Sequence, residues 1–212
     1  AYQSKNSPYY DWYEFQHFPD RYTAWWGIPI LPRIHPDRPA CRKFFTGEEG
    51  VIARYAELGI DGFRLDVADE LSDDFIADIK CTLAGKNPNT VLYGEVWEDA
   101  SDKIAYDQRK RYYLGDELDG VMNYPLRTGL LTYLKEGTCD ALSYALLTVT
   151  ANAPKRIADA QMNLLGTHDT ERVLTVLGGM SGDGLPNDEL ATLRMSKEQR
   201  DIARQKLKMA YT

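Results

Sequence analysis

The fold is decided by the stretch Ile60-Asp61-Gly62-Phe63-Arg64-Leu65-Asp66-Val67. Within it, apolar residues alternate with the charged residues Arg64 and Asp66, which is the period of a β-strand with one face in a packed layer. The two charged side chains stand two residues apart, so they leave the same face of the strand. The arginine favours the ionised form of the neighbouring carboxylate, and an ionised carboxylate near the C-terminal end of a strand is a candidate nucleophile. A structural ion pair explains the pattern equally well.

Further strand-like stretches follow this one, and helical patterns separate them. The alternation predicts an α/β fold with a parallel sheet whose faces are covered by helices. Thr46 and Glu49 form a capping-box pattern, which predicts that a helix begins there. The expected strands are residues 60–67, 91–96, 118–124 and 162–166. The expected helices are residues 46–58, 72–85, 104–114, 140–153 and 190–211, the third of them broken.

The N-terminal segment is rich in aromatic side chains. Residues 2–26 carry ten of them, interrupted by proline and aspartate, so that no helical period survives. This pattern predicts an irregular, aromatic-lined segment. Aromatic faces with polar tips suit sugar rings, which present apolar C–H faces and hydroxyl edges. For any single ring, packing of the loop itself is the commoner explanation.

Composition excludes some classes of function and disfavours others. The chain has 212 residues and a formal net charge of -7, which disfavours binding to nucleic acid or to an anionic membrane. No apolar run is long enough to predict a transmembrane helix. Three widely spaced cysteines, Cys41, Cys81 and Cys139, indicate neither a disulfide framework nor a zinc site. A reducing compartment is the default expectation, so we expect a cytoplasmic protein.

Side chains that can carry out chemistry gather where the four strands end. They are Arg64, Asp66, Glu95, Asn123, His168 and Asp169. Parallel α/β folds place their sites at this edge, and these charges would be costly in a core because each would need a partner. The set suits acid–base or glycosidic chemistry, which needs one carboxyl protonated and another ionised. A metal site is the competing interpretation, against which Arg64 argues because a guanidinium and a cation would compete for one carboxylate.

Several motifs resemble those of one enzyme family. Three of them resemble, in order, conserved motifs of the alpha-amylase family of glycoside hydrolases: Gly62-Phe63-Arg64-Leu65-Asp66, Gly94-Glu95-Val96-Trp97 and Leu165-Gly166-Thr167-His168-Asp169. Gly27-Ile28-Pro29-Ile30-Leu31-Pro32 resembles a short motif in the excursion after the third barrel strand. Val67-Ala68-Asp69-Glu70 and Val121-Met122-Asn123-Tyr124-Pro125 are most similar to the neopullulanase, cyclomaltodextrinase and maltogenic amylase branch. Each motif is moderately specific, and all of them in order are strongly specific.

The resemblance implies a (β/α)8 TIM barrel and a retaining mechanism on α-glucosidic bonds. In this mechanism Asp66 is the nucleophile and Glu95 the general acid/base. Asp169 holds sugar hydroxyls and stabilises the transition state, Arg64 positions Asp66, and His168 donates a hydrogen bond to the sugar at the scissile bond. The branch adds Asn123 and Glu70 as substrate-binding residues, although a strand-end turn and a helix-start carboxylate explain these two equally well. The expected partner is an α-glucan, with no cofactor, no metal site and calcium dependence left open.

The sequence departs from the family pattern in its extent. The family's first motif is absent, and the chain corresponds to barrel strands four to seven with their helices plus the excursion after strand three. We therefore expect residues 1–45 to belong to the excursion and residues 46–212 to a partial TIM-barrel catalytic domain. Open sheet edges predict self-association. A transglycosylase, a non-catalytic sugar-binding or structural fragment, and a metal-dependent enzyme remain the alternatives.

Overall fold

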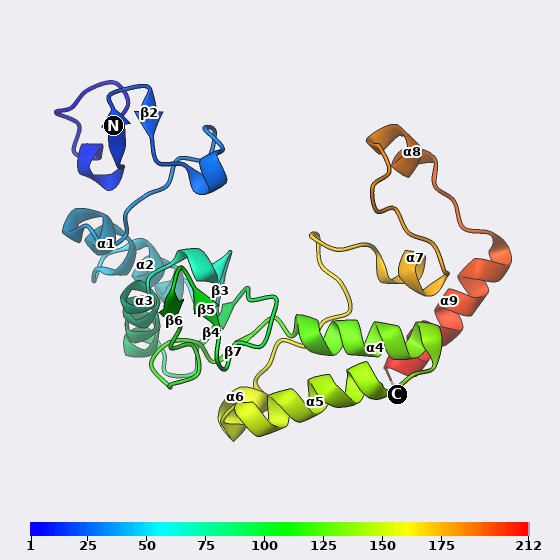
Figure 1. Cartoon of the computed structure of the whole chain (residues 1–212). Helices are drawn as coiled ribbons and strands as arrows, with labels where there is room; N and C mark the ends of the chain where they lie inside the picture. Colours follow the sequence, from blue (N-terminus) through cyan, green and yellow to red (C-terminus); the bar gives the residue numbers. More distant parts are fainter. Residues whose placement is uncertain (212) are drawn as a thin grey trace. The chain divides into compact units, whose positions relative to one another are not determined.

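The computed structural model describes residues 1–211, which form two compact units. The first unit comprises Ala1–Glu95 and Ile104–Asp119, and the second comprises Val96–Lys103 and the chain from Gly120 onward. Figure 1 shows the elements of both units. The predicted boundary between an excursion of residues 1–45 and a partial barrel of residues 46–212 stays a prediction. Within residues 1–211, every helix is too short or too polar to cross a bilayer.

The N-terminal segment is irregular and aromatic, as expected, with a short hairpin inside it. The 3-10 helix η1 (Tyr10–Trp12) precedes β1 (Phe15–His17), which pairs antiparallel with β2 (Arg21–Tyr22). A second 3-10 helix, η2 (Trp25–Gly27), follows. Ring contacts hold the segment together, among them the stacked pair Tyr10 and Phe15, whose centroids lie 5.2 Å apart.

Three helices pack together in the first unit: α1 (Pro39–Thr46), α2 (Val51–Glu57) and α3 (Asp73–Lys86). The predicted capping box at Thr46 is wrong. Thr46 is the last residue of α1, and its hydroxyl donates to the Arg42 carbonyl 3.0 Å away, while Gly50 caps α2. The helical pattern between residues 72 and 85 is confirmed by α3, which buries Phe75, Ile76, Ile79 and Leu83.

Two parallel strands lie beside these helices, β3 (Gly62–Leu65) and β4 (Val91–Gly94), with Gly62 opposite Val91 and Leu65 opposite Gly94. Both predicted strands are therefore confirmed, though shorter. The pairing needs glycine at position 62, because a Cβ there would lie 2.0 Å from the Val91 carbonyl oxygen. The 3-10 helix η3 (Ala68–Glu70) follows β3 after Asp66 and Val67.

The broken helix predicted for residues 104–114 is wrong. The chain instead forms a two-stranded hairpin of β5 (Ile104–Ala105) and β6 (Gln108–Arg109). Its two turn residues, Tyr106 and Asp107, have φ values of 53° and 59°, which is the backbone of a tight hairpin turn. The hairpin presents Tyr106 at its tip.

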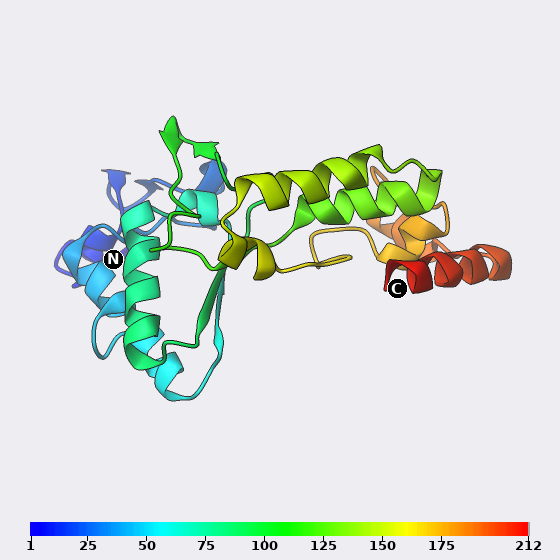
Figure 2. The same cartoon turned by 90° about the horizontal axis from the view of Figure 1, so that it is seen from below.

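The second unit is mainly helical. Strand β7 (Gly120–Val121) leads through Met122, which forms a parallel bridge with Met162, into α4 (Tyr124–Glu136). The strand predicted for residues 118–124 is thus shortened to β7 and Met122, and the strand predicted for residues 162–166 is reduced to the bridge at Met162. Helices α4 and α5 (Asp140–Asn152) pack side by side in both views (Figures 1 and 2). Helix α5 confirms the prediction for residues 140–153, whereas α4 was not predicted.

Shorter helices and a C-terminal helix complete this unit: α6 (Lys155–Asp159), α7 (Val173–Leu177), α8 (Asn187–Thr192) and α9 (Lys197–Ala210). The single helix predicted for residues 190–211 is wrong, because the chain leaves α8 after Thr192 and α9 begins with a capping box of Ser196 and Gln199. A core of Leu131, Leu134, Leu177 and Ala203 joins α4, α7 and α9.

Candidate active site

Arg64, in β3, contacts two carboxylates at once. Its Nη1 atom pairs with Asp66 Oδ1, and its Nη2 atom lies 3.1 Å from Glu95 Oε2. The parallel register explains this arrangement, because Asp66 follows β3 as Glu95 follows β4. The Glu95 side chain is 9% exposed and the Asp66 side chain is 75% exposed. The structure thus joins the two predicted carboxylates through one guanidinium and gives them very different access to water.

Glu95 also holds the backbone that follows Asp66. Its Oε2 atom accepts a hydrogen bond of 2.8 Å from the N–H of Val67. Val67 has φ 43° and ψ 59°, the left-handed region that a β-branched residue rarely adopts. Backbone hydrogen bonds at the strand end fix the same turn, since Glu95 N–H donates to the Leu65 carbonyl at 2.9 Å. Such a backbone outlier next to a charged pair is typical of a functional site.

Asp66 lines a cleft of about 390 Å³ within the first unit. This volume falls within the range of small-molecule sites. One wall comes from the N-terminal segment and the other from the turn after β3. The lining residues include Trp25, Leu31, Pro32, Asp66, Val67 and Glu70. The cleft therefore combines apolar and aromatic surface with two carboxylates.

Glu70 is fixed in the cleft wall by contacts from two other segments. Its side chain accepts a hydrogen bond from the Tyr106 hydroxyl, and its carbonyl accepts one from Arg33 Nη2 at 3.4 Å. The hydrogen bond to the Glu70 carboxylate raises the pKa of the Tyr106 phenol. Glu70 is thus more than a solvated helix-start carboxylate, and its substrate-binding role stays a prediction.

In the second unit, His168 and Asp169 form a local pair. His168 Nε2 lies 3.3 Å from Asp169 Oδ2, and the two side chains are 77% and 38% exposed. The Asp169 N–H donates to Thr167 Oγ1 at 3.2 Å, and this hydroxyl also contacts the Tyr124 hydroxyl at 3.1 Å. Asp169 does not cap a helix, because α7 begins later with Arg172 at its N-cap. Both side chains are therefore accessible to a ligand.

Asn123 is buried and its groups bind other parts of the second unit. Its Oδ1 atom accepts from the Leu126 N–H at 3.2 Å and so caps α4, while its Nδ2 atom donates to Asn163 Oδ1 at 3.0 Å. Asn123 therefore has a structural function at the end of the predicted strand, as the N-cap of α4. The expected contact with substrate stays a prediction.

Across residues 1–211, no group of three or more His, Cys, Asp or Glu side chains is arranged to hold a metal ion. The carboxylates of Asp66 and Glu95 both pair with the Arg64 guanidinium.

Comparison with known proteins gives the family. Residues 1–198 match the family described as alpha amylase, catalytic domain. The chain belongs to the alpha-amylase family. A cyclomaltodextrinase from Geobacillus thermopakistaniensis is 32% identical over 82% of this chain and 29% of its own length. Neopullulanase 2 from Thermoactinomyces vulgaris is 30% identical over 84% of the chain and 30% of its own length.

Solved structures agree with this assignment. The type III pullulan hydrolase from Thermococcus kodakarensis has a TM-score of 0.76 and 28% identity, covering 98% of this chain and 34% of that one. This alpha-amylase family chain thus spans less than a third of the length of the two curated relatives. It carries part of the family's TIM-barrel fold, and within residues 1–211 neither unit contains a closed barrel.

Trp25 and Tyr106 at the cleft, and the exposed Trp97 of the second unit, were not proposed as site residues from the sequence. Trp25 lines the cleft, and its ring stacks on Trp26 with centroids 4.6 Å apart. Tyr106 reaches Glu70 from the hairpin. Trp97 is 45% exposed and stacks on Tyr124 at 3.9 Å. The aromatic N-terminal segment signalled the first, whereas nothing in the sequence spacing relates the other two to their partners.

Proposed function

We propose that this chain supplies part of the active site of a retaining glycosidase. The substrates are starch-derived α-glucans, pullulan or cyclodextrins. Three kinds of observation support the proposal: membership of the alpha-amylase family, the names cyclomaltodextrinase and neopullulanase of its relatives, and the cleft next to Asp66. The single observation that carries it is the contact of one guanidinium, that of Arg64, with both Asp66 and Glu95.

The chemistry that we assign proceeds in two displacements. A carboxylate oxygen of Asp66 attacks the anomeric carbon, and the bond to the leaving sugar oxygen breaks while Glu95 donates its proton to that oxygen. Glu95 then removes a proton from water, the water oxygen attacks the anomeric carbon, and the bond to Asp66 breaks. The configuration is retained, and both carboxyl groups return to their first state.

The remaining predicted residues bind the substrate in this scheme. Arg64 holds Asp66 in place, Asp169 binds sugar hydroxyls in the transition state, and His168 donates a hydrogen bond to the sugar at the scissile bond. The accessibility of Asp169 and His168 supports these roles. Glu70 supports a sugar from the cleft wall, whereas Asn123 acts through the start of α4.

Trapping of the covalent intermediate tests the proposal directly. A fluorinated glucosyl fluoride slows release of the sugar, so the protein mass should rise by one sugar, and peptide mapping should place it on Asp66. The Asp66→Asn variant should remain unlabelled, and Asp69→Asn serves as the matched control that should be labelled. Labelling of the Asp66→Asn variant at another carboxylate would remove Asp66 from the role of nucleophile.

A second candidate is an α-glucan-binding protein without turnover. The observation that favours it is the 75% exposure of Asp66, since a reacting carboxylate is normally enclosed when substrate binds. Under this alternative, the chain binds maltooligosaccharides and Asp66→Asn leaves binding unchanged, with no product released by the parent. Transglycosylation differs only in the acceptor and is recognised by longer products at high sugar concentration.

Other properties remain proposals. We keep a cytoplasmic location, supported by the absence of disulfides among Cys41, Cys81 and Cys139 within residues 1–211. Self-association through open sheet edges is tested by light scattering, where a stable monomer would contradict it. Independence from cofactors and calcium is tested by assaying after treatment with a chelator, which should leave the rate unchanged.

A further inference from the structure

The turn that carries Glu70 is bound by one other segment of the first unit, residues 104–112. Three consecutive residues of the turn, 69–71, each accept a hydrogen bond from this segment. The pairs are the Tyr112 hydroxyl to Asp69 Oδ1 at 2.7 Å, the Tyr106 hydroxyl to the Glu70 carboxylate, and Lys110 Nζ to the Leu71 carbonyl at 2.7 Å. Among the three, the Tyr106 contact is the one made to a side chain that lines the cleft.

The three donors differ in burial, and Tyr106 is the exposed one. Tyr112 is 0% exposed and Lys110 is 8% exposed, so their hydrogen bonds belong to the packed interior. Tyr106 is 63% exposed at the tip of the hairpin, where its φ of 53° is unfavourable for a residue with a side chain. A hydrogen bond within reach of water adds little to stability, because water can replace either partner. The position of Tyr106 therefore serves the fold less than it serves Glu70.

The Tyr106 hydroxyl also contacts the opposite wall of the cleft. The hydrogen bond to Glu70 raises the pKa of this phenol, and a hydrogen bond with the Trp26 side chain opposes the rise. The Trp26 ring stacks on Trp25, which lines the cleft, with centroids 4.6 Å apart. Glu70 belongs to the wall formed by the turn after β3, whereas Trp25 and Trp26 belong to the N-terminal segment. One phenol thus connects the two walls.

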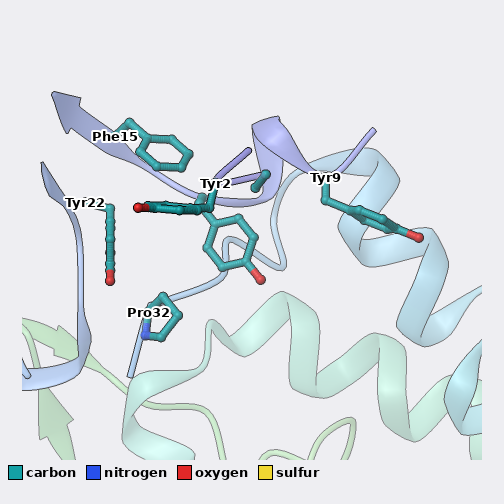
Figure 3. A pocket seen from close by; sticks show the side chains of 7 residues that line it. Tyr2, Tyr9, Phe15, Tyr22 and Pro32 are labelled. Carbon is teal, nitrogen blue, oxygen red and sulfur yellow. The ribbon is translucent and has the colours of Figure 1, made fainter. Parts of the chain in front are cut away.

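The N-terminal wall needs such contacts because it is not backed by closely packed side chains throughout. A second pocket of about 350 Å³ lies in this segment, and Pro32 lines both this pocket and the cleft. Figure 3 shows Tyr2, Phe15, Tyr22 and Pro32 around the space. Side chains that border an empty space lose packing contacts on that side. Bonds from neighbouring segments, such as that of Tyr106 with Trp26, therefore contribute more to the position of this wall.

The hydrogen bond from Tyr106 fixes the direction of the Glu70 carboxylate. Tyr106 donates to Oε1, which leaves Oε2 with the capacity to accept from a hydroxyl in the cleft. We infer that Tyr106 is a positioning residue, which joins the two walls of the cleft and orients the Glu70 carboxylate toward a hydroxyl of the bound sugar. This inference rests on the proposed function.

Titration calorimetry with the 212-residue chain tests the inference. All proteins carry Asp66→Asn, so that no sugar is consumed, and maltotriose is the probe. Tyr106→Phe keeps the ring and removes only the hydroxyl. We expect it to weaken maltotriose binding about fivefold, the equivalent of one hydrogen bond. Tyr144→Phe makes the same change on α5, in the second unit, and should leave the affinity unchanged.

Substitution of Glu70 shows whether Tyr106 acts through it. Glu70→Ala should itself weaken binding, and Tyr106→Phe added to Glu70→Ala should change the affinity by less than about twofold. A residue that only supports the fold would cause the same loss with and without Glu70. With Asp66 restored, Tyr106→Phe should raise KM for maltotriose about fivefold and change kcat by less than about twofold, because it removes binding that substrate and transition state share.

Thermal unfolding separates positioning from stability. Tyr106→Phe should lower the melting temperature by less than about 4 °C. Tyr112→Phe removes the buried hydroxyl that binds Asp69, so its melting temperature should fall further.

Three results overturn the inference, and they differ in what else they affect. If Tyr106→Phe binds maltotriose as tightly as Tyr144→Phe, the positioning function is wrong and the proposed function stands. If the loss persists in Glu70→Ala, or the melting temperature falls as far as in Tyr112→Phe, Tyr106 does not act by positioning Glu70. If the protein with Asp66→Asn alone binds no maltotriose, the proposed function fails and the inference fails with it.

Discussion

The Glu95 carboxylate accepts a hydrogen bond from the backbone N–H of Val67 at 2.8 Å, and Val67 directly follows Asp66. The φ value of 43° at Val67 costs about 1–2 kcal/mol for a non-glycine residue, so other contacts must hold this turn in place. Glu95 is one of those contacts. The proposed acid/base residue and the proposed nucleophile are therefore mechanically linked, both through Arg64 and through this turn.

Substitution of Glu95 separates its chemical function from its structural one. Glu95→Gln keeps an acceptor for Val67 but cannot transfer a proton, so we expect hydrolysis of maltoheptaose to fall by about 10²–10⁴-fold. Its free energy of unfolding should stay within about 1 kcal/mol of the parent, whereas Glu95→Ala should lose about 1–3 kcal/mol because a backbone donor loses its acceptor. Initial rates and urea unfolding measure the two effects. Equal stability of both variants would contradict the structural role.

Two glycines of the first unit should respond in opposite ways to the same substitution. Gly62→Ala places a Cβ 2.0 Å from the Val91 carbonyl oxygen and should separate β3 from β4, at a cost of about 1–3 kcal/mol or more. Gly85→Ala introduces its Cβ into open space within α3, where alanine is favoured over glycine by about 0.5–1 kcal/mol. Thermal unfolding of both variants measures the effect. If Gly85→Ala destabilised the protein as much as Gly62→Ala, the steric explanation for the difference between the two positions would be wrong.

Glu117 should make the stability of the protein depend on pH. Burial, more than the nearby charge of Asp73, raises the pKa of Glu117 from 4.5 to about 7, although Arg111 opposes the shift. The folded state therefore holds this proton more tightly than the unfolded state, and the free energy of unfolding contributed by Glu117 falls as pH rises from about 4.5 to about 7. The total loss is about 3 kcal/mol.

The Glu117→Gln variant should remove this dependence. Its unfolding free energy should match that of the parent below about pH 4.5, and it should be the more stable of the two above about pH 7. Glu198→Gln, an exposed substitution on α9, should show the pH dependence of the parent. Denaturant unfolding at a series of pH values measures the effect, and parallel curves for parent and Glu117→Gln would remove Glu117 as its source.

Local sequence patterns predicted the pairing of Arg64 with Asp66 because these two residues lie close in sequence. The alternation around Arg64 and Asp66 gives the strand and the charge pair together, and Glu95 follows the next apolar strand. The Val67 conformation and the contact of Tyr106 with Glu70, 36 residues away, depend on tertiary packing that no spacing reveals.

The failed predictions have local physical causes. The Thr46 and Glu49 pattern is also compatible with a helix end, where the threonine hydroxyl bonds back to the helix and glycines interrupt the chain. The hairpin at residues 104–109 lacks the usual Asn-Gly turn signal and uses Tyr106 and Asp107 instead. Helix α4 was not predicted, since the pattern was interpreted as a strand over residues 118–124; the helix begins after the Asn123 cap, and Pro125 is tolerated in its first turn.

A buried ion pair should matter far more to stability than an exposed one. Lys80 pairs with Asp119, whose Oδ2 atom also accepts the Leu92 N–H at 2.8 Å, and both charged side chains are largely buried. Asp119→Ala leaves the lysine charge and a strand donor without this partner, so we expect a loss of about 3–5 kcal/mol. Asp159→Ala breaks the exposed pair with Lys155 on α6 and should change the unfolding free energy too little to measure.

The double variant Lys80→Met/Asp119→Ala should recover part of the stability lost in Asp119→Ala, because it also removes the unpaired lysine charge. Urea unfolding of the parent, Lys80→Met, Asp119→Ala and the double variant gives the coupling energy, and additive losses would show that Lys80 and Asp119 do not act as a pair.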